Sequence, residues 1–149
     1  MADKNNDVQI RQMKETDIDA ILEIDKRISG QERAFTYENL FDGLIGGEIA
    51  CSFIAEVGSQ VVGFVLSAIT YVPEEVSEVC MIQILGVHPE FRRRGIASKL
   101  IGALADHCSS KGIEMIRVMV NQHDMHLQGL FETLEFRRGN MIDYSLFLH

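Results

Sequence analysis

The sequence has little of what several protein classes require. Its three cysteines, Cys51, Cys80 and Cys108, lie far apart with no CxxC spacing, so the spacing offers no disulfide framework or thiolate zinc cage and suggests a reducing compartment. Only two prolines and no low-complexity tract are present, unlike a disordered chain. The longest nearly apolar stretch, residues 61–69, is far shorter than the ~20 residues of a membrane helix. The polar, acidic start is unlike a secretory signal, and we expect a cytoplasmic protein.

Positive charge is scarce as well. The net charge is −8, which disfavours a general nucleic-acid binder because such proteins need a cationic surface. Residues 38–90 hold eight carboxylates and no lysine or arginine, and then Arg92, Arg93 and Arg94 follow together. This group of cations in an acidic surrounding is a candidate anion site.

The size and balance of residues indicate one globular domain over residues 1–149. The chain is 46% hydrophobic and 24% charged. At this length a chain buries roughly 68–70% of the surface that it exposes when unfolded, which is enough for a core. We find no repeat and no linker.

Hydrophobic periodicity predicts a mixed α/β fold. A first helix has Thr16 as its N-cap and Gly30 as its stop, and Pro89 ends a buried strand. Gly112 marks the end of the long third helix, and Asp124 is the N-cap of the last. The predicted strands cover residues 8–13, 51–57, 61–71, 79–87, 113–120 and 141–148, and the other helices cover residues 32–44, 96–109 and 124–134.

The segment from the end of the fourth predicted strand into the third helix carries the chemistry. The first N–H groups of a helix have no partner within it and lie at the positive end of the helix dipole. Gly95 and Ala97 lack bulk and allow a phosphate to approach this backbone. The segment is neither a Walker loop nor a GxGxxG motif. It predicts a pyrophosphate cradle; the alternative is a solvated arginine run that caps a helix.

These residues resemble the GNAT superfamily, the N-acetyltransferases that move an acetyl group from acetyl-CoA to an amine. Arg92, Gly95 and Ala97 match its signature of Arg or Gln, two residues, Gly, one residue, and Gly or Ala. Residues 130–136 are similar to its LYxxxGF helix end, and Asn121 matches an asparagine often found beyond its fifth strand. The resemblance covers nearly the whole chain and implies a central, mostly antiparallel sheet of six or seven strands with about four helices.

The resemblance also implies how CoA binds. The pantetheine arm pairs with the backbone of Leu85, Gly86 and Val87 like an added strand, because the fourth and fifth strands of this fold splay apart. Asn121 contacts that arm and Phe131 lies near the thioester sulfur, unless Asn121 only ends a strand and Phe131 is a core aromatic. The CoA pyrophosphate is held by Arg92, Arg93, Arg94, Gly95, Ile96, Ala97 and Ser98.

Catalysis requires a neutral amine, so a base or a desolvated pocket must remove its proton. Several family members carry a carboxylate at the position that Met81 occupies here. A tyrosine that acts as the general acid is frequent in the family at the position of Phe131. Glu78 is the nearest upstream carboxylate, with an exposed strand start as its alternative role. Gln83 shares a strand face with Met81 by the period of two and could orient a water.

Two other groups invite a chemical interpretation. Cys80 has no adjacent base and fits the core better than a nucleophile. His123 and His126 could share a helix face, but no third metal ligand is identifiable, so no metal is expected. Glu135 stands where the family usually has a glycine, which predicts a differently shaped turn.

The leading hypothesis is therefore an N-acetyltransferase that transfers acetyl from the cosubstrate acetyl-CoA to a primary amine, by direct attack in a ternary complex. The carboxylates of residues 38–90 favour a cationic acceptor, and a homodimer is compatible with the sequence. One alternative is a noncatalytic acyl-CoA-binding regulatory module. Another, a nucleotide-phosphate binder, would need a glycine-lysine loop that is absent.

Overall fold

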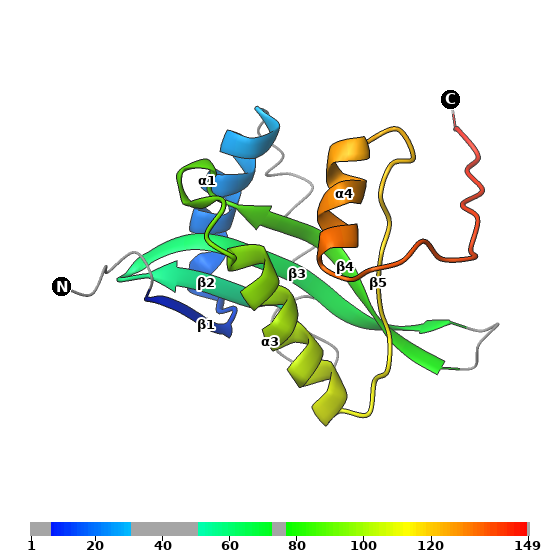
Figure 1. Ribbon diagram of the computed structural model, residues 1–149, viewed down its shortest axis with the longest axis horizontal. Coiled ribbons are helices and arrows are strands. Elements are labelled where there is room, and N and C mark those ends of the chain that lie inside the picture. The colour runs from blue at the N-terminus through cyan, green and yellow to red at the C-terminus, as the bar shows by residue number, and fades with distance from the viewer. Residues whose placement is uncertain (1–6, 31–50, 73–76, 149) are drawn as a thin grey trace. The chain divides into compact units, whose positions relative to one another are not determined.

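The computed structural model describes residues 7–30, 51–72 and 77–148 (Figure 1). The chain divides into two compact units, residues 1–119 and 120–149, and each is described by itself. The helix predicted at residues 32–44 lies outside the described residues. Among those described, no helix is both long enough and apolar enough to cross a bilayer.

The first unit is built on a five-stranded sheet in the order β1-β2-β3-β4-β5. The first four strands pair antiparallel and β5 pairs parallel with β4. This confirms the mixed α/β class, although the described residues contain one strand fewer than the sequence predicts. The strands are β1 (Val8–Gln12), β2 (Phe53–Val57), β3 (Gln60–Val72), β4 (Ser77–Val87) and β5 (Ile116–Val118).

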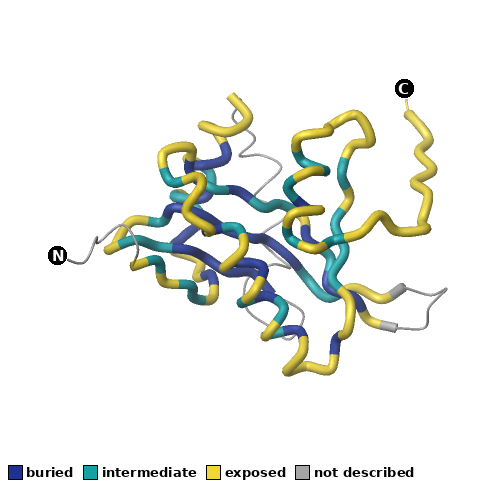
Figure 2. The backbone as a smooth tube through the Cα atoms, viewed as in Figure 1, coloured by how far each residue is buried: buried dark blue, intermediate teal, exposed yellow. Residues whose placement is uncertain are grey.

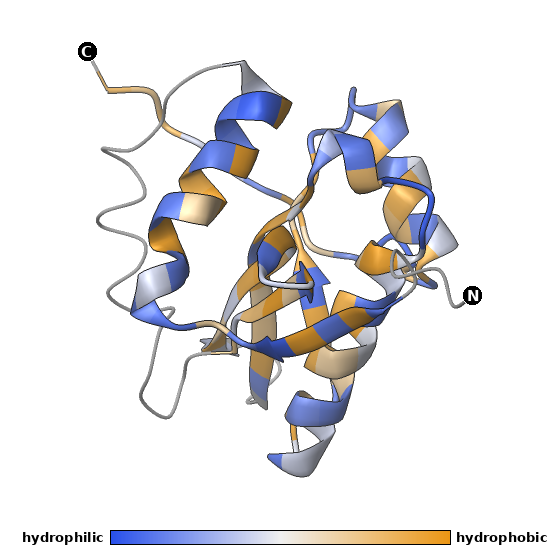
Figure 3. Ribbon diagram, turned by 90° about the vertical axis from the view of Figure 1, so that its left-hand side faces the viewer, coloured by the Kyte–Doolittle hydropathy of each residue, from blue (hydrophilic) through white to orange (hydrophobic). Residues whose placement is uncertain are grey.

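Two helices, α1 (Ile18–Ser29) and α3 (Ile96–Ser110), cover opposite faces of this sheet (Figure 1). Neighbouring residues of a strand point to opposite faces. Phe64 packs in a core cluster with Ile21 and Ile24 of α1, whereas a Cβ at Gly63 would lie 3.0 Å from Cγ2 of Ile96 in α3. Figure 2 shows the buried centre of the sheet between the helices, and Figure 3 shows that hydrophobic and hydrophilic residues alternate along its strands.

The start of α1 differs from the sequence prediction. Thr16 is not the N-cap, because a 3-10 turn (Glu15–Asp17) precedes the helix and Asp17 takes that position. Its carboxylate accepts two hydrogen bonds from Arg11, at 2.8 and 2.7 Å, and one from the Lys14 N–H at 2.7 Å. These bonds join the start of the helix to β1. Gly30 ends the helix with φ +72°, as predicted.

Gly86 in β4 is required by packing. A Cβ at this position would lie 2.7 Å from Cζ of the fully buried Phe64 ring and 3.3 Å from Cδ1 of Ile28. We expect Gly86→Ala to lower the free energy of unfolding by about 1–3 kcal/mol, because the ring has no space to move. Urea denaturation measures this. Gly102→Ala in α3 is the control: nothing lies within 4 Å of its Cβ position, so stability should stay equal or rise.

The second unit contains the helix α4 (Met125–Thr133). Asp124 caps it as predicted, because its Oδ1 accepts from the Leu127 N–H at 3.0 Å. Glu135 adopts φ +73° after the helix, a conformation that usually favours glycine.

The closing strand predicted at residues 141–148 is wrong for this structure. These residues form no strand and their apolar side chains are exposed, among them Ile142, Tyr144 and Phe147. Alternation of apolar and polar residues shows only that a segment could pair. A strand also needs a partner ladder, and this segment has none in the described part of the chain.

Candidate functional site

Among the described strands of the first unit, β5 leaves the end of β4 unpaired on one edge. Pairing with β5 covers only Cys80–Ile82 against Ile116–Val118, whereas β4 pairs with β3 as far as Val87. The two strands therefore part after Ile82, as the family resemblance implied. Within the described residues, the β4 edge from Gln83 to Val87 keeps backbone donors and acceptors that β5 does not use.

A β-bulge lies where the two strands part. Ile82 and Ile84 of β4 face the consecutive residues Ser67 and Leu66 of β3, so Gln83 is the extra residue. A bulge bends the strand and redirects its polar groups. Met81 and Gln83 were predicted to share a strand face because side chains alternate between the two faces of a regular strand. The bulge interrupts this alternation between them. Gln83 itself is exposed.

His88 holds the turn that follows β4. The backbone N–H of His88 donates to the Val62 carbonyl at 2.8 Å, and the ring Nδ1 of His88 accepts from the Glu90 backbone N–H at 3.1 Å. Its ring meets the Phe91 ring edge to face, with centroids 5.5 Å apart. The side chain is buried, so it fixes the chain at the point where the arginines begin. This role of His88 could not be predicted from the sequence, because it depends on contacts made only in the fold.

The three arginines after this turn are all exposed. Arg92 donates through Nε to the Val87 carbonyl at 3.4 Å, and the Arg94 guanidinium lies 4.8 Å from the centre of the Phe91 ring. Arg93 has φ +66°, an uncommon conformation for a residue other than glycine. Protein contacts therefore orient Arg92 and Arg94 and leave their charges open to solvent.

The N-terminus of α3 offers free backbone donors. Gly95 is its N-cap, with φ +73° and no side-chain cap. The first α-helical hydrogen bond runs from the Lys99 N–H to the Gly95 carbonyl at 3.0 Å. The N–H groups of residues 96–98 come before this bond, so they have no acceptor within the helix. None of the described residues lies within 4 Å of a Cβ built on Gly95. Open space, helix donors and nearby cations are the features that the binding of a polyanion requires.

The two predicted catalytic residues lie apart on β4. Glu78 is exposed and pairs with Tyr71 of β3 near the beginning of the strand. It precedes Ile82 by four residues, or roughly 13 Å of strand. Gln83 instead lies where β4 and β5 separate. Their roles stay predictions, and the geometry brings only Gln83 to the strand separation.

Asn121 and Phe131 belong to the second unit. The Asn121 Oδ1 accepts from the His123 N–H at 2.8 Å, and its carbonyl accepts from the Asp124 N–H at 3.0 Å. Phe131 is buried and packs edge to face on Phe136, with ring centroids 5.2 Å apart. These contacts fit the turn and core alternatives, and the contacts of both residues with CoA stay predictions.

Cys80 is not activated as a nucleophile. A hydrogen bond with Cys108 lowers the pKa of its thiol, but a hydrogen bond with Cys51 and burial outweigh this and raise that pKa to about 11. The thiol is therefore protonated at neutral pH, which fits the expected core position.

A mixed sheet that opens after Ile82, next to a helix N-terminus preceded by three arginines, fits the arrangement that the family resemblance implied. The profile of the acetyltransferase (GNAT) family matches residues 17–136. The chain belongs to this family.

Individual relatives agree with this assignment. An acetyltransferase of Pectobacterium atrosepticum is 35% identical over 89 residues, which cover 60% of this chain and 59% of that protein. The aminoglycoside N-acetyltransferase AAC(6')-Iy, solved with a CoA-linked bisubstrate analogue, superposes with a TM-score of 0.79 at 23% identity, covering 95% of this chain and 99% of that one. A ribosomal-protein-alanine N-acetyltransferase of Brucella melitensis superposes with a TM-score of 0.75 at 19% identity, over 95% and 99% of the chains.

Proposed function

We propose that the protein transfers the acetyl group of acetyl-CoA to a primary amine by direct attack in a ternary complex. The observation that carries the proposal is the uncapped N-terminus of α3 beside three exposed arginines, at the end of a strand with a free edge. Family membership supports the reaction class. The structures of AAC(6')-Iy with CoA and with a CoA-linked analogue support the donor.

In this proposal the CoA pyrophosphate binds the N–H groups of residues 96–98 and the guanidinium groups of Arg92 to Arg94. Helix donors and guanidinium groups are the partners that phosphate oxygens prefer. The pantetheine amides pair with the β4 edge at Leu85 and Val87, as a peptide adds a strand to a sheet. The thioester then lies toward Gln83, where β4 and β5 part.

The chemistry follows from this placement. The amine nitrogen attacks the thioester carbonyl carbon, and the carbon–sulfur bond breaks as the oxyanion collapses. Backbone N–H groups of β4 near the bulge hold the oxyanion. The CoA thiol, with pKa near ~8.5, leaves as a thiolate without receiving a proton first. The amine proton passes to a water oriented by Gln83, with Glu78 as the nearest carboxylate on the strand.

The experiment mixes the protein with acetyl-CoA and a panel of amines and follows release of the CoA thiol. We expect thiol release that depends on both the amine and the enzyme. Met81 stands where the family resemblance places a carboxylate in several members, and this favours a second candidate, a noncatalytic acyl-CoA-binding module. Acetyl-CoA binding in calorimetry without thiol release for any amine would select that candidate.

We also expect the acceptor to be cationic. Residues 38–90 carry only acidic charges; of these, Glu78 is exposed on β4, whereas Glu38, Asp42, Glu74 and Glu75 lie outside the described residues. Such a field attracts a cationic amine and repels an anionic one.

The measurement compares kcat/KM for amines matched in size but opposite in charge. The cationic amine should be preferred at low salt, and the preference should weaken as ionic strength rises, because charges are screened beyond about 8–10 Å. Equal kcat/KM values at low salt would contradict selection by charge.

A further inference from the structure

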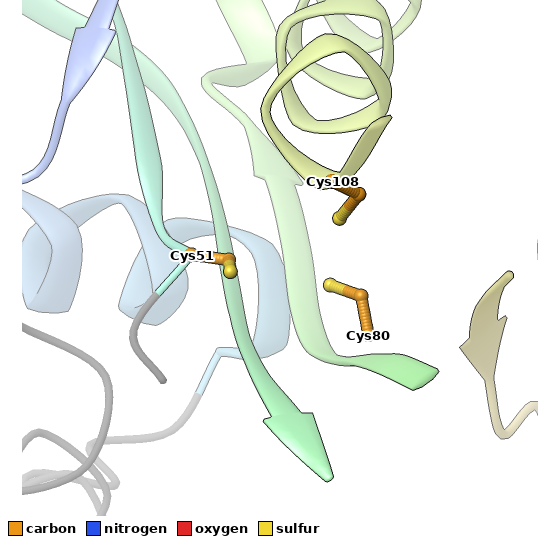
Figure 4. A group of neighbouring side chains, drawn as sticks. All are labelled: Cys51, Cys80 and Cys108. Carbon is orange, nitrogen blue, oxygen red and sulfur yellow. The ribbon is translucent and has the colours of Figure 1, made fainter. Parts of the chain in front are cut away.

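All three cysteines of the chain meet in the core of the first unit, far from one another in sequence (Figure 4). Cys51 precedes β2, Cys80 lies in β4 and Cys108 lies in the last turn of α3. Their sulfur atoms are all within 4.8 Å of one another, and each residue is at most 2% exposed. All three thiols are free. The proposed acetyl transfer uses none of them.

The distances suit a metal ion with three sulfur ligands. With metal–sulfur bonds of about 2.3 Å, a trigonal site places its sulfur atoms roughly 4.0 Å apart. The three thiols would therefore have to approach one another by less than ~1 Å. Rotation of side chains can provide this movement without a change of fold.

The backbone under each thiol is fixed. The Cys51 N–H donates to the Ser67 carbonyl at 3.1 Å, and the Cys80 N–H donates to the Met115 carbonyl at 3.0 Å. Cys108 is held in α3, where its carbonyl accepts from the Ile113 N–H at 2.9 Å. A ligand set on such rigid elements is organised before the metal arrives.

The chemistry of the donors selects the ion. Thiolates favour soft ions such as Cu⁺, whereas structural Zn²⁺ sites are almost always four-coordinate. The described residues bring only three metal ligands together at this point, and all are sulfur. The set thus suits a thiophilic ion that accepts three ligands.

We propose that Cys51, Cys80 and Cys108 form a three-thiolate site for a soft monovalent metal ion, for which Cu⁺ is the best fit. Binding replaces three S–H protons, which pass to solvent, with three metal–sulfur bonds, and no electron is transferred. Cys108 lies twelve residues after Ile96 in α3, roughly 18 Å along the helix axis. The metal site is therefore separate from the proposed CoA cradle.

The test adds Cu⁺ without oxygen to the reduced, metal-free, full-length protein. Native mass spectrometry should show one Cu⁺ per folded chain, and bound Cu⁺ should protect all three thiols from alkylation. In competition with a chromophoric Cu⁺ chelator, each single Cys→Ser variant should bind at least about tenfold more weakly. Met119→Ser, which removes an exposed sulfur outside the cluster, should bind as the wild type does.

A buried Cys→Ser change can also disturb folding, so Cys→Ala variants are compared and the wild type gives an independent measurement. Cu⁺ should raise the Tm of the wild type, because it binds the folded chain, and should leave CoA affinity unchanged. Absence of bound copper, equally tight binding by the urea-unfolded chain, or unprotected thiols would overturn the proposal. A mass loss of two hydrogens in place of bound metal, which indicates a disulfide, would also overturn it.

Discussion

Replacement of Gly95 by glutamate is expected to weaken CoA binding at least about a hundredfold, or ~2.7 kcal/mol. The position is open, with nothing within 4 Å of a Cβ, so the side chain would enter the space where we place the pyrophosphate. Its carboxylate would repel the phosphates and compete with them for the N–H groups of α3. The conformation, with φ +73°, adds strain for a residue other than glycine.

Two control variants separate these causes. Gly95→Asn is neutral and tolerates a positive φ, so its CoA affinity should stay within about tenfold of the wild type if charge dominates. Gly102→Glu adds the same charge at another open position of α3 and should leave affinity nearly unchanged. Calorimetry measures all three. Unchanged affinity in Gly95→Glu would contradict the cradle.

Replacement of Asp17 by asparagine is expected to lower the free energy of unfolding by about 2–3 kcal/mol at pH 7. The Asp17 carboxylate is 6% exposed and pairs with Arg11 at 2.7 Å. Asparagine keeps the shape but removes the charge-assisted bonds that join β1 to the start of α1. Urea denaturation measures the change. Glu23→Gln is the control: its pair with Arg27 is exposed on both sides, so at most ~0.5 kcal/mol should be lost.

The same variant has a defined pH dependence. Burial raises the pKa of Asp17, but hydrogen bonds from Arg11 and from the Lys14 N–H outweigh burial and lower the pKa below its usual value of 3.8. A carboxyl with a lowered pKa stabilises the fold above its unfolded pKa, and this contribution is lost as the pH falls through the folded pKa. The stability gap between wild type and Asp17→Asn should therefore shrink below about pH 4. If the difference in stability between the two proteins stayed constant from pH 7 to pH 2, the ion pair could not be its cause.

Features that depend on neighbouring residues were predictable from the sequence. Apolar spacing and Gly112 predicted α3 almost to its last residue, and Asp124 was correctly predicted as the cap of α4. The uncapped helix N-terminus beside the arginines, on which the proposed cradle rests, was also predictable, because the glycine and the arginines are adjacent in sequence. The free edge of β4 required the family resemblance, since a single strand carries no information on where its neighbour leaves it.

Features that depend on distant residues were not predictable. Thr16 fits the local pattern of an N-cap, but it lies within a 3-10 turn, and the N-cap is Asp17, which pairs with the distant Arg11. The bulge at Gln83 arises from the register between β3 and β4, which the sequence of β4 does not contain. Spacing likewise gave no sign of the cysteine cluster, because sheet and helix packing joins residues about thirty positions apart.

Amide chemical-shift mapping by NMR, while CoA is added to the protein, tests the proposed CoA site most directly. If the N-terminus of α3 holds the pyrophosphate, the largest changes should fall on the amides of residues 93–98, with further changes along the β4 edge from Gln83 to Val87. In the Gly95→Glu variant, the chemical shifts of the same amides should not change when CoA is added. Changes centred elsewhere, with the amides of residues 93–98 unaffected, would contradict the account.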